Sequence, residues 1–363
     1  MPPRKLSVGL DIGSQSTVLA VFDHTKQCSF PLELGGDKIL PSCVAVDDGD
    51  ILASTHNLIV GKRAETRSAK KCEGVLCAHR QLLYSFEDIW AVHRGISEQR
   101  WHFNVSAGDE GRGSRYQVRG AKITVEQFIS AILEVVATSL VESVRPGGYL
   151  QLDNGEAAEW LQMCIAVPEC FTAKQRQLFV DAAETIVRPR LGNTLAISTV
   201  NESTAVALQF CSIPPFQFRR FMCVDLGASK LTVACFELRQ CQGALLQLVE
   251  LAARTDVFCG SSEIEFRMMQ WCDKRKPFQQ AMLTSKPAMF KLRKEIRNAI
   301  KTLTVAEEAM IEVDGVVAGH DLQLMLTLED FERECADIFD SVVRLAESVI
   351  AEAGGAPPAE AVL

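Results

Sequence analysis

Hydrophobic and polar positions form the same pattern twice along the chain. Residues 8–22, VGLDIGSQSTVLAVF, place a polar, glycine-containing turn between two runs rich in valine and leucine, which predicts a strand, a turn and a second strand. Residues 223–238, CVDLGASKLTVACFEL, repeat the pattern. Superposing Asp11 on Asp225 (225 − 11 = 214) also superposes Gly13 on Gly227. An internal repeat this far apart predicts two similar lobes that face each other.

Other periodicities predict the elements around the repeat. Apolar residues at helical spacing indicate a helix at 124–144, with Thr124 as its N-cap. A buried strand closed by Pro168 is predicted at 161–171. The remaining predictions are a turn at 35–38, a helix at 173–187, a strand running into a helix at 195–210, helices within about 261–303, a hairpin at 311–327 turning at Asp314-Gly315, and a helix at 328–353.

Strands that alternate with helices indicate the α/β class, and 363 residues are enough for two domain-sized cores. Composition then excludes several classes of protein. The net charge of −8 argues against nucleic acid as a partner, because phosphate backbones select basic surfaces. No run approaches the roughly 18 apolar residues of a membrane span. The thirteen cysteines, in a chain without a signal-peptide pattern, indicate reduced thiols and a cytoplasmic protein.

The first turn has the residue types that bind phosphate and a hydrated cation. Asp11 at a strand end can hold magnesium through water, because Mg²⁺ keeps several waters and takes one or two carboxylates. Gly13 lets the backbone approach phosphate closely. The hydroxyl, amide and N–H groups of Ser14, Gln15 and Ser16 can donate to phosphate oxygens. One such turn is usually only a hairpin, but two related by a repeat favour a phosphate site with two walls.

Several runs carry a resemblance to a known family. The runs are VGLDIGSQSTVLAVF, LPSCVAV, IVGKRA, IAVPECFTAKQRQLFVDAAETI, VNESTAVALQF, VDLGASKLTV and LRKEIRNAIKTLTVAEEAMIEVDGV. In order and spacing they resemble the nucleotide-binding domain of the DnaK-type heat-shock protein 70 superfamily, from about residue 6 to the end, with 88–120 and 146–159 matching poorly. The turns G-S-Q-S and G-A-S are similar to the larger heat-shock protein 110 branch, whose members act as nucleotide exchange factors.

This resemblance implies a two-lobed, actin-like ATPase fold with a duplicated, ribonuclease H-like core. The implied boundaries are lobe I at 1–218, with subdomain IA at 1–45 and 124–218 and IB at about 46–123, and lobe II at 219–363, with IIA at 219–255 and 328–363 and IIB at about 256–327. In the family a glycine-rich loop, a linker and a peptide-binding region follow, so the resemblance implies a chain incomplete at its C-terminus.

The resemblance also implies ATP or ADP with magnesium as cofactors. The implied roles are Asp11 and Asp225 beside the metal, Ser14, Gln15 and Ser16 in the first phosphate loop, Glu202 near the attacking water, and Pro168 and Arg176 as a relay between the lobes. The bare pattern would make Pro168 a strand terminator and Arg176 an exposed helix residue. Glu202 is harder to explain in that way, because a carboxylate between a buried strand and a helix is costly without a partner.

Departures from the family pattern are concentrated at the site. His79 stands where the family has its catalytic lysine, and a neutral imidazole would stabilise a transferring phosphate less than a permanent cation. A packed or surface histidine, or a one-position slip in the match, is the alternative. In the second turn Gly227 is followed by Ala228, Ser229 and Lys230, where the family has further glycines and a threonine. Lys230 could lend its charge to a phosphate, but the favoured expectation is a solvated lysine.

Two further positions weaken the predicted nucleotide contacts. Thr232 replaces another family carboxylate. On the adenosine side, the family presents a glutamate, a lysine, a stacking arginine and a serine. The matching residues here are Arg297, Ile300, Lys301 and Thr304, with Gly260 near the same pocket. Isoleucine offers no hydrogen bond, and lysine stacks on a base less well than arginine.

Three functional hypotheses follow from these residues. The favoured one is a divergent chaperone or co-chaperone domain that binds ATP weakly, hydrolyses it slowly or not at all, and acts as an exchange factor or holdase. Its catalytic candidates are Glu202, Asp225 and His79. Its expected partners are other heat-shock chaperones, and unfolded clients through regions outside this chain, with no nucleic acid and no membrane. The alternatives are an active chaperone ATPase and, least favoured, a small-molecule kinase of the same fold.

Overall fold

The structure, a computed structural model, describes residues 3–46, 58–67, 69–84, 100–106, 114–118, 121–150, 152, 157–213, 218–240, 246–275, 281–317, 319–355 and 361–362. Two compact units divide the chain. Unit 1 comprises Met1–Thr66, Val75–Tyr84 and Ser106–Gln209, and unit 2 comprises Arg67–Gly74, Ser85–Val105 and Phe210–Leu363. The unit boundary after Gln209 lies nine residues before the lobe boundary expected after residue 218 (218 − 209 = 9). Two short segments expected in lobe I belong to unit 2.

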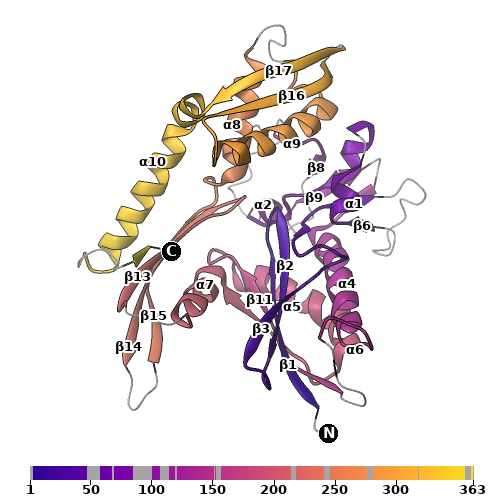
Figure 1. Ribbon diagram of the computed structural model, residues 1–363, viewed down its shortest axis with the longest axis vertical. Coiled ribbons are helices and arrows are strands. Elements are labelled where there is room, and N and C mark those ends of the chain that lie inside the picture. The colour runs from indigo at the N-terminus through magenta and orange to yellow at the C-terminus, as the bar shows by residue number, and fades with distance from the viewer. Residues whose placement is uncertain are drawn as a thin grey trace. The chain divides into compact units, whose positions relative to one another are not determined.

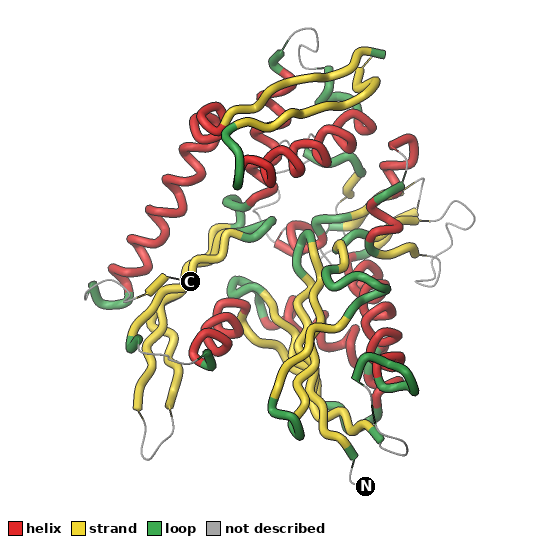
Figure 2. The backbone as a smooth tube through the Cα atoms, in the orientation of Figure 1, coloured by secondary structure: helices red, strands yellow, loops and turns green. Residues whose placement is uncertain are grey.

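Unit 1 is built on a mixed sheet with strand order β12-β11-β1-β2-β3 (Figures 1 and 2). β1 pairs with β2 in antiparallel and with β11 in parallel orientation, and β4 pairs with β2. The strands are β1 (Arg4–Ile12), β2 (Ser16–Asp23), β3 (Cys28–Leu32), β4 (Leu40–Pro41), β11 (Ala158–Val167) and β12 (Ala196–Asn201).

Helices and small sheets complete unit 1. They are α1 (Lys62–Glu65), α2 (His79–Tyr84), α4 (Val125–Ser143), α5 (Ala173–Ile186), α6 (Arg188–Leu191), α7 (Glu202–Cys211), β5 (Val44–Val46), β6 (Leu58–Val60), β7 (Val75–Leu76), β9 (Arg115–Val118) and β10 (Ala121–Ile123). β8 (Asn104–Ser106) and the end of α7 lie at the boundary of the units. The predicted helix at 124–144 is confirmed. The Thr124 side chain accepts from the Gln127 N–H, and the Gln127 side chain accepts from the Thr124 N–H, which together form a capping box.

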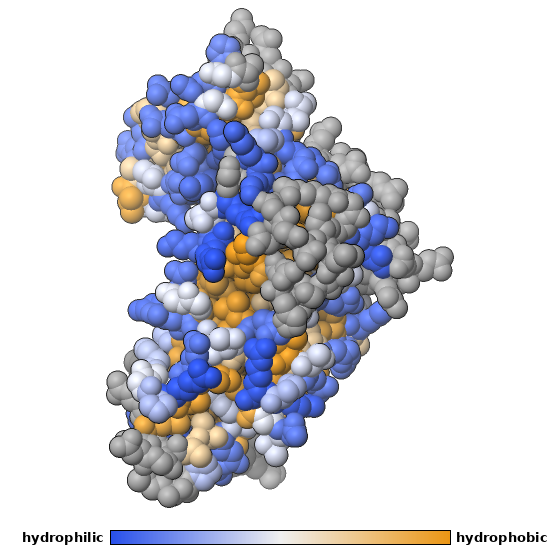
Figure 3. All heavy atoms as spheres, turned by 90° about the vertical axis from the view of Figure 1, so that its right-hand side faces the viewer, coloured by the Kyte–Doolittle hydropathy of each residue, from blue (hydrophilic) through white to orange (hydrophobic). Residues whose placement is uncertain are grey.

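Unit 2 has a sheet with strand order β15-β14-β13-β18. Its elements are η2 (Ala69–Gly74), β13 (Arg220–Leu226), β14 (Leu231–Gln240), β15 (Leu246–Asp256), α8 (Ser261–Asp273), α9 (Lys286–Leu303), β16 (Glu308–Val317), β17 (His320–Thr327), α10 (Leu328–Glu352) and β18 (Ala361–Val362). Its core joins Met268 and Met269 of α8 to Leu292 and Ile296 of α9 and to the inner face of β16 and β17. On the face that Figure 3 shows, hydrophilic and hydrophobic residues are interspersed over the described surface.

The predicted hairpin at 311–327 forms, but its predicted turn is wrong. β16 and β17 pair as far as Val317 and His320, so the chain reverses near Gly319 rather than at Asp314-Gly315. Gly315, with φ of 53°, lies at an irregularity of the ladder, where its N–H donates to Asp321 Oδ1 at 2.7 Å. A glycine with positive φ serves a bulge as well as a turn, so the local pattern could not separate the two.

The internal repeat extends to the pairing of every residue in the two hairpins. Asp11 lies opposite Val18 in β1 and β2, and Asp225 lies opposite Thr232 in β13 and β14, so one offset of 214 relates both ladders (232 − 18 = 214). β18 pairs in parallel with β13, as β11 does with β1. The mixed α/β architecture is therefore a duplicated one. Within the described residues, the helices are all too short or too polar to cross a bilayer.

Candidate functional site

The first turn connects β1 to β2 through residues 13–15 and is tightly closed. The Gly13 N–H donates to the Ser16 carbonyl at 2.8 Å, and a Cβ at Gly13 would lie 2.6 Å from that oxygen. Glycine is therefore required here by the close approach of the backbone. The Ser42 N–H donates to the Gln15 carbonyl at 2.9 Å and fixes the turn from outside, while the Ser14 side chain is buried.

Arg80 of α2 connects the first turn to α7. Its Nε donates to the Ile12 carbonyl at 2.8 Å, its Nη2 donates to Asp11 Oδ1 at 2.9 Å, and its Nη1 forms an ion pair with Glu202. The Arg80 side chain is 6% exposed, Glu202 11% and Asp11 48%. Burial acts to lower the pKa of Arg80, but the two carboxylates raise it above its usual value. Two predicted site carboxylates therefore share one permanent cation.

The residues expected to relay a signal contact each other and lead to Glu202. The Arg176 guanidinium donates to the carbonyls of Pro168 at 3.2 Å, Glu169 at 3.1 Å and Phe171 at 2.9 Å. The Glu169 carboxylate accepts from the Ser203 N–H at 2.7 Å, at the first turn of the helix that begins with Glu202. Arg176 is thus tied to the loop after β11 rather than free on the helix surface.

His79 lies in the core beside Arg80. Its ring is fully buried and stacks on Phe128 with centroids 4.9 Å apart. Among the described residues, neither ring nitrogen has a well-formed hydrogen bond. Burial and the charge of Arg80 lower its pKa to about 3, although the backbone of Ile12 acts in the opposite direction. His79 is therefore neutral near pH 7, and its placement favours the packed-histidine alternative over a replacement for a cation.

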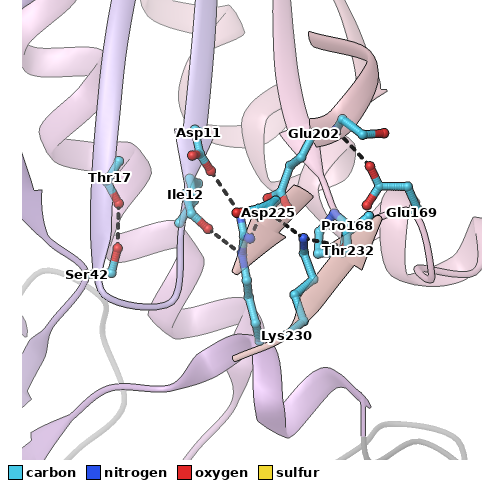
Figure 4. A network of polar contacts seen from close by, with 12 residues as sticks. Asp11, Ile12, Thr17, Ser42, Pro168, Glu169, Glu202, Asp225, Lys230 and Thr232 are labelled. Carbon is cyan, nitrogen blue, oxygen red and sulfur yellow. Dashed lines mark hydrogen bonds and ion pairs between the residues drawn. The ribbon is translucent and has the colours of Figure 1, made fainter. Parts of the chain in front are cut away.

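The second turn holds a buried lysine. Lys230 Nζ donates to Asp225 Oδ2 at 2.8 Å and to Thr232 Oγ1 at 2.8 Å (Figure 4). The Lys230 side chain is 2% exposed, whereas that of Asp225 is 40% exposed. The expectation of a solvated lysine is wrong, because the ammonium group neutralises the aspartate of its own turn and the stem packs inside unit 2.

Helix α8 fixes the second turn from outside. The N–H groups of Ser261 and Ser262 donate to the Gly227 and Ala228 carbonyls at 2.8 and 3.0 Å. A Cβ at Gly260 would lie 2.7 Å from the Ala228 oxygen, so this close contact requires glycine. At Gly227 a Cβ would be 3.5 Å from the Lys230 oxygen, an ordinary contact. The two turns thus have the same strand pairing but are held from outside by different segments, the first by Ser42 and the second by the N-terminus of α8.

Comparison with known protein families shows to which family this duplicated fold belongs. The model of the family described as Hsp70 protein matches residues 7–359. The chain belongs to the Hsp70 family. Its relatives include a "Heat shock 70 kDa protein" of Neurospora crassa, 22% identical over 96% of this chain and 49% of that protein, so the chain spans about half of its length. A "Putative heat shock 70 kDa protein 7" of Homo sapiens is 23% identical over 97% of this chain and 88% of that protein. A "Chaperone protein DnaK" of Thermus thermophilus is 23% identical over 73% and 37%.

Family membership gives the actin-like ATPase fold, and Hsp70 proteins as a family bind ATP or ADP with magnesium and work with co-chaperones and clients. The second turn does not fit a magnesium ion at Asp225, because Oδ2 of that carboxylate already accepts from the buried Lys230 ammonium. At the first turn, Asp11 Oδ1 accepts from Arg80. The described residues hold no group of three metal-binding side chains.

The residues matched to the Hsp70 adenosine contacts have partners inside unit 2. Arg297 forms a two-point contact with Glu265 of α8, at 2.6 and 3.2 Å. The Thr304 hydroxyl donates to the Lys301 carbonyl at 2.7 Å at the C-terminal end of α9. Lys301 is exposed, and Ile300 packs against the core. Arg297 would have to leave a charge-paired partner in order to contact a ribose.

Three residues at these positions escaped the analysis of the sequence. Arg80 adjoins His79 at the start of the short helix HRQLLY, and nothing in that mixed polar and apolar segment indicates a buried charge. Glu169 follows Pro168, but nothing local indicates its bond to Ser203. Glu265 precedes its partner Arg297 by 32 residues, and such pairing is visible only in the fold.

Proposed function

We propose that this chain is the nucleotide-binding domain of a divergent Hsp70-type chaperone or co-chaperone, which binds adenine nucleotide weakly and hydrolyses it slowly or not at all. The buried, neutral His79 is the observation that carries this proposal. A phosphate in transfer is stabilised by fixed positive charge, and an imidazole with a pKa of about 3 supplies none near neutral pH.

The state of Arg80 supports slow hydrolysis as well. Its guanidinium is the nearest permanent cation to His79 in sequence, yet it is already engaged with Asp11, Glu202 and the Ile12 carbonyl. Glu202, the carboxylate assigned to the attacking water, is in turn held in that ion pair. A carboxylate bound to a buried guanidinium is a weaker acceptor for a water proton than one without such a partner.

Weak binding follows from the turns and from the adenosine side. The amides of Ser261 and Ser262, at the N-terminus of α8, are used to hold the second turn. Arg297 is paired with Glu265, and Thr304 with its own helix. Breaking a hydrogen bond to a charged group costs roughly 1.5–3 kcal/mol, and about 4 kcal/mol separates a micromolar from a millimolar ligand. If nucleotide binding has to break two such hydrogen bonds, the dissociation constant lies far above the micromolar range.

Isothermal titration of the chain with ATP and ADP, together with single-turnover hydrolysis, tests the proposal. We expect dissociation constants above about 100 µM and hydrolysis slower than that of a DnaK control measured alongside. Low-micromolar affinity with hydrolysis equal to the control would contradict it and support the alternative of an active chaperone ATPase. Phosphoryl transfer to a sugar or other small molecule would support the kinase alternative.

The same proposal includes a role toward a partner protein: nucleotide exchange activity on another Hsp70 chaperone. It is supported by the G-S-Q-S and G-A-S turns, which resemble the heat-shock protein 110 branch, and by a site that does not depend on rapid turnover. We expect a full-length protein containing this chain to speed the release of fluorescent ADP from a cytoplasmic Hsp70 partner. Release at the unassisted rate would contradict this part and leave the nucleotide-binding proposal intact.

A further inference from the structure

The ammonium group of Lys230 is an unusual occupant of a phosphate turn. Lysine side chains are almost never fully buried unless they are paired, whereas this one is among the largest that are fully buried in the described part of the protein. Its nitrogen lies 2.8 Å from Asp225 Oδ2 and 2.8 Å from Thr232 Oγ1 (Figure 4). The positive charge is therefore fixed beside the one carboxylate of the second turn that the family pattern assigns to metal.

Three neighbouring strands position this ammonium group. Asp225 of β13 lies opposite Thr232 of β14, which lies opposite Thr255 of β15. The two threonine hydroxyls are 3.1 Å apart and hydrogen-bonded, and Lys230, the last residue before β14, brings its ammonium group to Thr232 Oγ1. A charge held by a row across a sheet does not swing away as a surface lysine does.

The charges of the turn change together relative to the family pattern. Lys230 stands where the resemblance places a neutral threonine, which adds one positive charge, and Thr232 stands where it places a carboxylate, which removes one negative charge. The turn is therefore two charges more positive than the pattern. This equals the charge of one magnesium ion.

We propose that Lys230 replaces the divalent cation at the second turn, so that this chain binds nucleotide phosphate without magnesium. The inference rests on the proposed function. A second cation at Asp225 would meet a buried ammonium group that already occupies Oδ2, and like charges at this separation repel. The turn remains open to a ligand, because the Asp225 side chain is 40% exposed. Lysine is a common point-charge partner of phosphate.

The test compares nucleotide affinity in excess magnesium and in EDTA. For the wild-type chain, we expect the two dissociation constants for ADP to agree within about threefold. Lys230→Thr restores the family residue, and we expect its affinity in EDTA to fall by at least about tenfold relative to magnesium. Lys294→Thr removes an exposed lysine from α9 of the same unit and keeps the wild-type ratio.

A wild-type chain that loses more than about tenfold of its affinity in EDTA overturns this inference and leaves the proposed function standing. Binding in neither condition overturns both. The wild-type comparison needs no variant, so a Lys230→Thr protein that fails to fold does not remove the test. Lys230→Arg, which keeps the charge, provides the second variant and is expected to retain a ratio near that of wild type.

Discussion

The first turn takes its positive charge from a distant helix, whereas the second carries its own. Asp11 is paired with Arg80, 69 residues away, and Asp225 with Lys230, five residues away. Under the 214-residue offset, Lys230 corresponds to Ser16. The backbone ladder has been kept in both copies while the source of charge has diverged. The comparison shows that neutralising the turn aspartate is common to both copies, but the residue that does so is not.

The far ends of the two hairpins make the same point. Asp23 at the end of β2 and Glu237 in β14 are related by the same offset (237 − 23 = 214), and both are buried. Asp23 binds Arg4, and Glu237 binds Arg220 and Arg239. A buried carboxylate needs a partner, so each copy has kept an acid and obtained its own arginines.

The largest expected difference between the two turns is the loss of stability when the cation that pairs with each turn aspartate is removed. Arg80→Met leaves the paired Glu202 and the Ile12 carbonyl without their buried partner, and we expect a loss of about 3–5 kcal/mol in unfolding free energy. Lys230→Met leaves a half-exposed Asp225 that water can reach, and we expect a loss of only about 1–2 kcal/mol. Urea unfolding of both variants measures the difference. Equal losses would show that the two cations are equally important for stability.

Acid should weaken unit 1 through His79, a feature without a counterpart in the second turn. The pKa of this histidine is about 3 in the folded protein, against 6.5 unfolded, so the unfolded state binds the proton first as pH falls. Its contribution to stability is complete above pH 6.5 and is lost as pH falls toward 3. At pH 5 the loss is about 2 kcal/mol (1.5 pH units).

His79→Leu removes this titration while keeping a buried apolar side chain. We expect the variant to be close to wild type in stability at pH 7 and to lose about 2 kcal/mol less between pH 7 and pH 5. Thermal unfolding across this pH range gives the comparison. Parallel curves for the two proteins would mean that His79 reaches solvent or a partner when it is protonated.

Replacing the corresponding glycine of each turn by alanine is expected to change stability by smaller amounts, and by different amounts in the two turns. A methyl group at Gly13 would lie 2.6 Å from the Ser16 backbone oxygen, and Gly13→Ala is expected to cost about 1–3 kcal/mol. At Gly227 the nearest oxygen is 3.5 Å away, and Gly227→Ala should change stability by no more than about 0.5 kcal/mol. Chemical unfolding of the two alanine variants decides whether the tight closure is confined to the first turn.

Much of the fold was predictable because its signals are local. The repeat around Asp11 and Asp225, the cap at Thr124 and the strand closed by Pro168 are patterns of neighbouring residues, and the structure confirms all of these elements. The predicted position of the hairpin turn, at Asp314-Gly315, is wrong, because a glycine with positive φ can serve either a bulge or a turn.

The candidate site was less predictable, because its properties depend on what surrounds each side chain. The sequence identifies Lys230 and His79 as departures from a pattern but says nothing of their burial. Both turned out to lie inside the protein, one paired with Asp225 and the other stacked on Phe128. His79 stacks on a residue 49 positions further along the chain (128 − 79 = 49), and Lys230 is buried by the packing of unit 2, so no local pattern reveals either environment.

Hydrogen exchange of the backbone amides, with and without saturating ADP, tests most directly the proposal that the glycine turns bind nucleotide. We expect slower exchange in residues 13–16 and in residues 227–230 at the same ADP concentration, with one dissociation constant describing both. Protection of only one turn, or of neither at a concentration that saturates binding, would contradict it.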